Sequence, residues 1–259
     1  MRLDHVALAT RDAGGPLATL VGDLGAIVLS GGLALGYRPM QVYLGNEEMG
    51  MKVELLEPWD VASNDFLDRF LTRHGDGPHH LTFKVDDLEA TLDEMSGAGL
   101  TPIGVDLSMP IWKEAFLQPR EAHGTVVQLA ESSSPAKTAF EEYRLVRDGG
   151  VPLMTEQWWP DTPPRAADGT ILRRIVMATP SIPDALRFFA GMLGGTPSGQ
   201  GADGAEGQDW VELEWPGGGH LRLEHRTDRQ AGVDRLEADG PGPSRVLELA
   251  GTRFVINPE

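Results

Sequence analysis

The sequence contains no cysteine among its 259 residues, which excludes disulfide scaffolds, thiolate zinc sites, iron–sulfur clusters and cysteine nucleophiles. Basic residues are also few: 22 Lys and Arg face 39 Asp and Glu, for a formal net charge of −17. Because a surface of that sign repels phosphate backbones, we expect no nucleic-acid partner. No apolar run reaches the roughly 20 residues of a membrane-spanning helix, and no apolar segment opens the chain, so we expect no membrane partner and a cytoplasmic location.

An internal repeat organises the first half of the chain. Residues 3–10 and 78–85 both alternate as strands and are both followed by a helical pattern that ends at glycine. Each copy closes on a strongly strand-like run, at 51–56 and at 125–130, and the helical spacing of 61–74 predicts a connecting helix. The pattern therefore predicts a βαβββ module that occurs twice.

The second half contains a weaker pair of copies. Residues 172–179 predict a strand and 184–193 a helix, whereas the last copy, over 232–258, is shorter and lacks a helical pattern. The Gly-rich residues 196–208 predict a loop. We thus predict an α+β protein of paired βαβββ modules, with two module pairs in one chain and the second pair degenerate. The expected limits are a metal-binding domain at 1–131, a linker at 132–168 and a degenerate domain without metal ligands at 169–259.

Matching positions in the two N-terminal copies carry side chains that bind metals. His5 matches His80, and Glu54 matches Gln128, with nearly equal spacing within each copy. If the copies pair about a pseudo-twofold axis, two nitrogens and two oxygens converge from four strands. Such a set suits one divalent ion of Zn, Ni, Co, Mn or Fe. The alternative is that the histidines are ordinary partly buried residues and that Glu54 and Gln128 face solvent. His79 is the second choice for His80, but an odd step along a strand would turn it to the opposite face.

The stretches around these positions resemble a known family, the vicinal oxygen chelate superfamily of glyoxalases, bleomycin-resistance proteins and extradiol dioxygenases. The likeness spans residues 1–131 and is closest to methylmalonyl-CoA epimerase. It is carried by LDHVA, KVELLEP, GPHHLTFKVDD, FLQP and GTVVQL, in that order. In that family the positions that match His5, Glu54, His80 and Gln128 hold the metal.

The resemblance implies a metal-dependent lyase or isomerase of the epimerase or glyoxalase type, acting on a small molecule. Such an enzyme removes a proton next to a carbonyl or thioester and stabilises the enolate on a divalent metal. Glu54 is the candidate base, because it is the only carboxylate in the set. One alternative is a non-catalytic protein that binds or sequesters a small molecule, and another is an Fe(II) extradiol dioxygenase. The chain is expected to be a monomer or a homodimer.

The sequence departs from the epimerases in its acids. Gln128 stands where they usually have Glu, and residues 36–42 lack the acid thought to serve as their second base. Glu114, on the matching strand of the second module, could substitute as an acid at the substrate. The simpler interpretation of Glu114 is a surface strand residue.

The degenerate half has arginines where the first half has ligands. Arg174 matches His5, Arg222 matches Glu54 and Arg235 matches His80, and guanidinium groups do not bind cations. These arginines could bind a carboxylate or phosphate of the substrate. The alternative is that they pair with carboxylates on neighbouring strands, at Glu212, Glu214 or Glu224.

Overall fold

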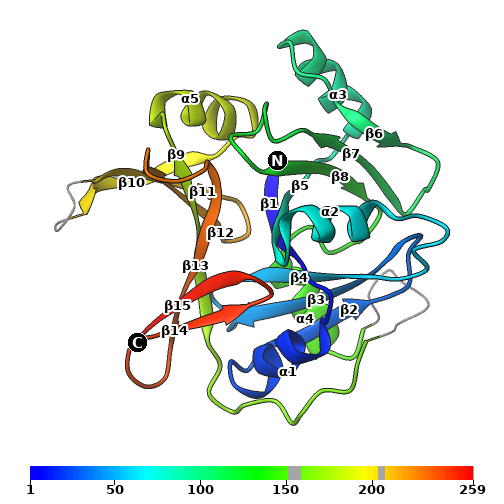
Figure 1. The fold of residues 1–259 in the computed structure, drawn as a ribbon, viewed down its shortest axis with the longest axis vertical. Coiled ribbons are helices and arrows are strands. Elements are labelled where there is room, and N and C mark those ends of the chain that lie inside the picture. Colours follow the sequence, from blue (N-terminus) through cyan, green and yellow to red (C-terminus); the bar gives the residue numbers. More distant parts are fainter. Residues whose placement is uncertain (151–158, 204–207, 259) are drawn as a thin grey trace. The chain divides into compact units, whose positions relative to one another are not determined.

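The computed structural model describes residues 1–150, 159–203 and 208–258 (Figure 1). The helices are α1 (Gly14–Gly22), α2 (Phe66–His74), α3 (Leu88–Gly97), α4 (Ala139–Arg147), α5 (Ile182–Leu186) and the π-helix η1 (Arg187–Met192). The strands of the first half are β1 (Arg2–Ala9), β2 (Ile27–Gly31), β3 (Tyr37–Gly45), β4 (Gly50–Pro58), β5 (Gly77–Lys84), β6 (Ile103–Asp106), β7 (Trp112–Leu117) and β8 (Val126–Ser132). Those of the second half are β9 (Ile171–Thr179), β10 (Thr196–Asp203), β11 (Gln208–Trp215), β12 (Gly219–His225), β13 (Gly232–Gly240), β14 (Arg245–Leu249) and β15 (Thr252–Pro258).

The strands form two mixed sheets, and this confirms the predicted α+β fold of repeated modules. The order in one sheet is β2-β3-β4-β1-β5-β8-β7-β6, and in the other it is β10-β11-β12-β9-β13-β15-β14. In the first three modules the opening strand pairs in parallel with the closing strand: β1 with β4, β5 with β8 and β9 with β12. Residues 232–258 form three strands and no helix, as the sequence predicts for the shortened copy.

The chain divides into two compact units that interleave along the sequence. Unit 1 comprises Met1–Asp4, His80–Thr138 and Arg174–Arg235, and unit 2 comprises His5–His79, Ala139–Arg173 and Leu236–Glu259. This division does not test the predicted limits at 1–131, 132–168 and 169–259, which stay a prediction. Within the predicted linker, residues 151–158 lie outside the described part of the chain.

Unit 1 holds the second module and the third. The carboxylate of Asp87 caps α3 by accepting the backbone N–H of Ala90 at 2.9 Å, as expected of an aspartate before an apolar helical pattern. Phe83 of β5 packs edge-to-face on Trp215 of β11 with ring centroids 5.3 Å apart. The indole of Trp215 donates to the carbonyl of Leu193, so this large side chain is buried with its polar group satisfied.

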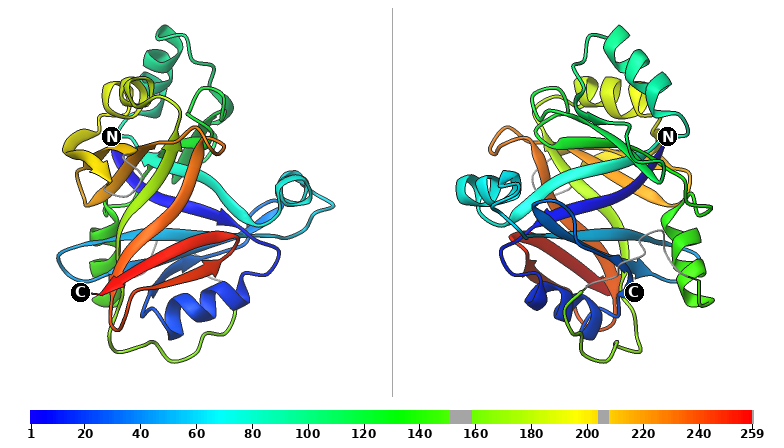
Figure 2. Two further views of the ribbon diagram at one scale, coloured as in Figure 1. Left: turned by 60° about the vertical axis from the view of Figure 1, so that its left-hand side comes forward. Right: turned by 90° about the vertical axis from the view of Figure 1, so that its right-hand side faces the viewer.

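Unit 2 holds the first module, and α4 packs on its strands β2 and β4 (Figure 2). Tyr143 of α4 stacks on Tyr43 of β3 with ring centroids 4.9 Å apart, and Leu29 and Ala139 complete this buried cluster. The segment 163–170 runs past α1, where the backbone N–H groups of Ala166 and Thr170 donate to carbonyls at its end (Figure 1). The described residues from Ala139 to Thr170 are therefore part of the packing of unit 2.

The predicted loop at 196–208 was wrong for residues 196–203, which form β10, while 204–207 lie outside the described residues. This strand pairs with β11. Gly199 and Gly201 lie against the ring of Trp210, where an added Cβ would approach ring atoms to 3.4 and 2.9 Å. Glycine at these two positions therefore allows the backbone of β10 to pack directly against the ring of Trp210. The predicted helices also changed in extent: α2 begins at Phe66, and 182–192 divides into α5 and a π-helix.

Candidate metal centre

The first half of the site lies on β1 and β4. His5 is 1% exposed, and its neighbour Ala7 pairs with Glu54 on the adjacent strand, so the two side chains come from neighbouring backbones. His5 Nε2 lies 3.4 Å from Glu54 Oε2. The other carboxylate oxygen, Oε1, accepts the side-chain amide N–H of Gln41, directly opposite on β3, at 2.9 Å.

The spacing of His5 and Glu54 fits a shared ion. At 3.4 Å the N···O contact is longer than the roughly 2.9 Å of an ordinary hydrogen bond. Two ligand atoms at about 2.0–2.1 Å from a tetrahedral ion are about 3.3 Å apart. Imidazole and carboxylate are both ligands that borderline divalent ions accept. The pair therefore fits as part of a metal's ligand set.

The second half of the site lies on β5, β7 and β8. Thr82 pairs with Gln128 in the parallel ladder, and its hydroxyl donates to Gln128 Oε1 at 2.5 Å. Gln128 Nε2 donates to Glu114 Oε2 at 2.8 Å, and the indole N–H of Trp112 donates to the same oxygen at 2.8 Å. Since an amide oxygen has two lone pairs, the bond from Thr82 is compatible with Gln128 as a ligand. His80 lies edge-on to Phe116, with ring centroids 6.4 Å apart.

The two modules thus carry the same pair of groups on exchanged strands. In the first module the amide is Gln41 on β3 and the carboxylate is Glu54 on the closing strand β4. In the second the carboxylate is Glu114 on β7 and the amide is Gln128 on the closing strand β8. Each module therefore contributes one carboxylate that is held by an amide N–H.

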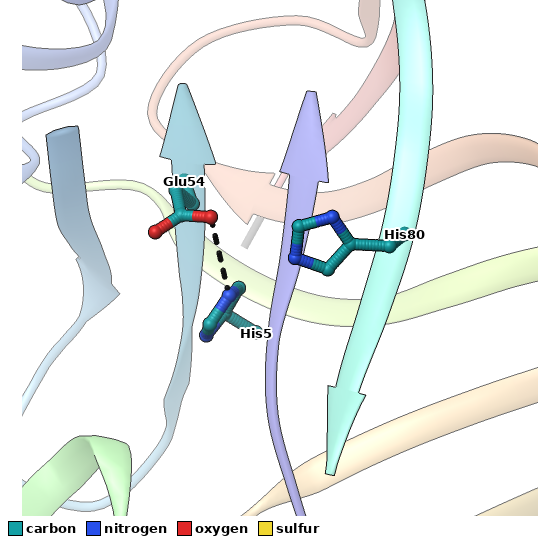
Figure 3. A group of neighbouring side chains, drawn as sticks. All are labelled: His5, Glu54 and His80. Atoms are coloured by element: carbon teal, nitrogen blue, oxygen red, sulfur yellow. Dashed lines mark ion pairs between the residues drawn. The ribbon is translucent and has the colours of Figure 1, made fainter. Parts of the chain in front are cut away.

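His5, Glu54 and His80 form a group that could hold a metal ion. Each offers one ligand atom, these atoms all lie within 4.8 Å of one another, and all three residues are buried. Figure 3 shows the side chains on β1, β4 and β5 directed toward one another. Within the described parts of the chain, no second group of three such side chains gathers.

His79, the second choice for His80, lies with α2. Its ring packs edge-to-face on Phe70, with centroids 4.6 Å apart, and on Phe66 at 6.1 Å. Burial lowers the pKa of His79 to about 4, although the charge of Glu54 acts in the opposite direction. His79 is therefore an uncharged ring in an aromatic cluster at neutral pH.

The arginines of the second half pair with carboxylates on neighbouring strands. Arg174 and Arg222 both contact Glu212 Oε2, and Arg235 donates to both carboxylate oxygens of Glu224 at 2.6 and 3.0 Å. The guanidinium of Arg222 also stacks on Trp210, with its carbon 4.1 Å from the ring centroid. These contacts are the arrangement given above as the alternative to an anion pocket.

The sequence reasoning missed four residues beside the candidate ligands: Gln41, Thr82, Trp112 and Lys52. Lys52 is 1% exposed, two positions before Glu54 on the same strand. A signal for it was present, because strand alternation turns Lys52 to the same face as Glu54. A lysine on a buried face requires a partner, and a search for that partner leads to this network.

Comparison with protein families bears on the first half of the chain. Residues 4–110 match the Glyoxalase/Bleomycin resistance protein/Dioxygenase superfamily. The resemblance to this superfamily that the motifs indicate is thereby confirmed. No curated protein matches the sequence.

Solved structures show likeness over one half and over the whole. A methylmalonyl-CoA epimerase of Streptomyces coelicolor in complex with 2-nitronate-propionyl-CoA is 21% identical, with 52% of this chain and 99% of that chain covered and a TM-score of 0.45. A hypothetical protein from Bacillus halodurans C-125 is 26% identical, with 53% and 98% covered and a TM-score of 0.46. A hypothetical protein from Staphylococcus aureus covers 100% of this chain and 99% of its own, with 9% identity and a TM-score of 0.62. The last of these shares the fold of the entire chain.

Across the described residues, every helix is too short or too polar to traverse a lipid bilayer.

Proposed function

We propose that His5, Glu54, His80 and Gln128 hold one divalent ion in an enzyme that removes a proton next to a carbonyl or thioester of a small molecule. The reaction would be of the epimerase or glyoxalase type. The observation that carries this proposal is the gathering of two imidazoles and a carboxylate, all buried, with ligand atoms within 4.8 Å of one another. The family match over residues 4–110 supports it.

A bound divalent ion would polarise the carbonyl and offset the negative charge of an enolate. Glu54 is the proposed base, and Gln41 holds its carboxylate in one orientation through the 2.9 Å bond to Oε1. Glu114 is the proposed second acid, in place of the acid that β3 lacks. Its Oε2 is held by Gln128 and Trp112, which fixes the plane of the carboxylate.

Metal content tests the site. We expect about one divalent ion per chain in the wild-type protein and strongly reduced content in His5→Ala and His80→Ala. His79→Ala is the matched control, because it removes an imidazole next to His80 that packs on α2. Inductively coupled plasma mass spectrometry of dialysed protein measures the content. Metal content in His5→Ala and His80→Ala that equals that of the wild type and of His79→Ala would rule out the proposed ligand set.

Proton exchange tests the reaction. The metal-loaded protein is incubated in D₂O with acyl-CoA thioesters and with hemithioacetals, and deuterium incorporation is followed by mass spectrometry. We expect exchange that Glu54→Gln abolishes and Glu114→Gln slows by about 100-fold or more, the usual scale of a lost general acid or base. Exchange that survives Glu54→Gln unchanged would exclude Glu54 as the base. Metal binding without exchange on any substrate would favour a binding protein.

A second candidate function follows from the donor set itself. Two histidines and one carboxylate are also the ligands of non-haem Fe(II) oxygenases. Oxygen uptake by the Fe(II)-loaded protein with catechols distinguishes this candidate from the first. Uptake that His80→Ala abolishes would favour the dioxygenase.

A further inference from the structure

A buried lysine lies beside the candidate site and is not among the proposed ligands. Lys52 of β4 is 1% exposed, and its ammonium donates to Glu142 Oε2 at 2.6 Å. Glu142 belongs to α4, which is part of the predicted linker and not of a βαβββ module. A buried ammonium without a counter-charge is costly, so this ion pair ties α4 to the first module.

The same ammonium reaches the candidate site through one amide. Lys52 Nζ lies 3.4 Å from Gln41 Oε1, and Gln41 Nε2 donates to Glu54 Oε1 at 2.9 Å. An ammonium can only donate, and an amide accepts with its oxygen and donates with its nitrogen. Lys52 therefore favours the amide orientation in which the nitrogen of Gln41 faces Glu54.

The orientation of that amide matters for Glu54. With the nitrogen toward Glu54, the amide stabilises the carboxylate and leaves Oε2 on the side of His5, 3.4 Å from Nε2. A flipped amide would set its oxygen against Oε1 and repel the carboxylate. Groups that orient a metal's ligands commonly change its affinity by about 10–100-fold when they are removed.

We propose that Lys52 is a positioning residue: through Gln41 it fixes the carboxylate of Glu54 for the metal, with Glu142 of α4 as its counter-charge. The inference rests on the proposed metal site. It makes the linker helix a functional part of the first module, and it assigns Gln41 the role of a relay.

Positioning and simple charge repulsion predict opposite changes in metal affinity when Lys52 is replaced, and this makes the proposal testable. The ammonium of Lys52 repels a cation, so charge alone predicts that Lys52→Met binds metal more tightly. Positioning predicts weaker binding, because the amide of Gln41 loses the partner that sets its orientation. The direction of the change therefore distinguishes the two effects.

The experiment is a titration of metal-free protein with Co²⁺, followed by calorimetry and by the visible absorption of the bound ion. We expect Lys52→Met and Gln41→Leu each to weaken Co²⁺ binding by about 10-fold or more. The double variant should bind no more weakly than Gln41→Leu alone, because Lys52 acts through that amide. Leu17→Ala, a buried position in α1, is the control for lost stability and should bind as the wild type does.

A second measurement does not depend on metal. In ¹⁵N-labelled metal-free protein, the side-chain amide signal of Gln41 is assigned by its absence in Gln41→Leu. We expect a resolved, slowly exchanging pair of resonances in the wild type and a shifted, averaged pair in Lys52→Met. If Lys52→Met does not fold, Lys52→Met combined with Glu142→Gln removes both charges and takes its place in both measurements.

Three results would overturn the inference: unchanged or tighter Co²⁺ binding in Lys52→Met, additive losses in the double variant, or an unchanged amide signal of Gln41. Failure of the proposed metal site is a different result, in which the wild-type protein itself binds no Co²⁺. In that case the amide signal still decides whether Lys52 orients Gln41.

Discussion

Glu212 is held ionised by three side chains, and its loss should change the acid stability of the protein. The side chain is 16% exposed, and the pKa of Glu212 is lowered from 4.5 to about 2 by His220, whose Nδ1 lies 3.6 Å from Oε1, and by the charges of Arg174 and Arg222. A carboxyl whose pKa is lower in the folded state stabilises the fold above its unfolded pKa. That stabilisation is lost as the pH falls from about 4.5 through about 2.

The magnitude follows from the two pKa values. A tenfold change in proton affinity is worth about 1.4 kcal/mol, so the difference between 4.5 and about 2 corresponds to about 3 kcal/mol at neutral pH. Glu212→Gln lacks the charge and should lose an amount of this order at pH 7. At pH 2.5 the wild type retains only a small part of this stabilisation, so the free energies of unfolding of the two proteins should become similar.

The assay is urea unfolding of the wild type and of Glu212→Gln at pH 7, 5, 3.5 and 2.5. Glu214→Gln is the matched control, because Glu214 lies on the same face of β11 but is exposed. We expect its difference from the wild type to stay within about 0.5 kcal/mol at every pH, as for ordinary surface substitutions. If the difference in the free energy of unfolding between Glu212→Gln and the wild type is the same at all four pH values, the reasoning is refuted.

Two further substitutions test the networks around the candidate ligands. Glu142→Gln removes the carboxylate that the buried ammonium of Lys52 contacts at 2.6 Å, so we expect a loss of about 3–5 kcal/mol in urea unfolding, most of which Lys52→Met should restore in the double variant. A loss below about 1 kcal/mol would contradict a buried pair. Gln128→Glu sets a second carboxylate at the position from which Gln128 Nε2 now donates to Glu114 at 2.8 Å, and two carboxylates so close share one proton. Sharing raises the pKa of one carboxyl of the pair in the folded protein, so the pair does not destabilise the fold below about pH 4, where both states are protonated. As the pH rises, the unfolded chain loses this proton first, and the variant should lose stability relative to the wild type between pH 5 and 8. Glu114→Gln in the same chain should cancel the effect.

The positions of most strands could be predicted from the sequence because the alternation of apolar and polar residues follows which face of a strand is buried. His5 and His80 each lie on the opening strand of a module, and their spacing to Glu54 and Gln128 marked the closing strands. Local rules also held where one residue determines a structure, as for Asp87 at the start of α3. Such features depend on neighbours in the sequence.

The partners of these residues could not be predicted in the same way. Gln41 meets Glu54 through the antiparallel register of β3 and β4, and Glu142 reaches Lys52 from 90 residues away. Alternation indicates the face on which a side chain lies, but not which residue lies opposite. The strand β10 was missed for a related reason, since its glycines pack beneath Trp210, which lies on another strand.

Only one of the two apparent losses of an acid is made up on another strand: Glu114 lies beside Gln128, whereas Gln41 lies beside Glu54, a carboxylate that the proposed ligand set already contains. From the sequence, Gln128 and the residues around Gln41 each lack a carboxylate that the epimerases carry. In the structure each of these amides donates to a carboxylate on the adjacent strand, Glu114 in one module and Glu54 in the other. An amide next to a carboxylate stabilises its charge, whereas a second acid would compete for it. Each module therefore has one carboxylate whose charge a neighbouring amide stabilises, and comparison of matching sequence positions finds Glu54 and Glu114 but not the amide that holds each of them.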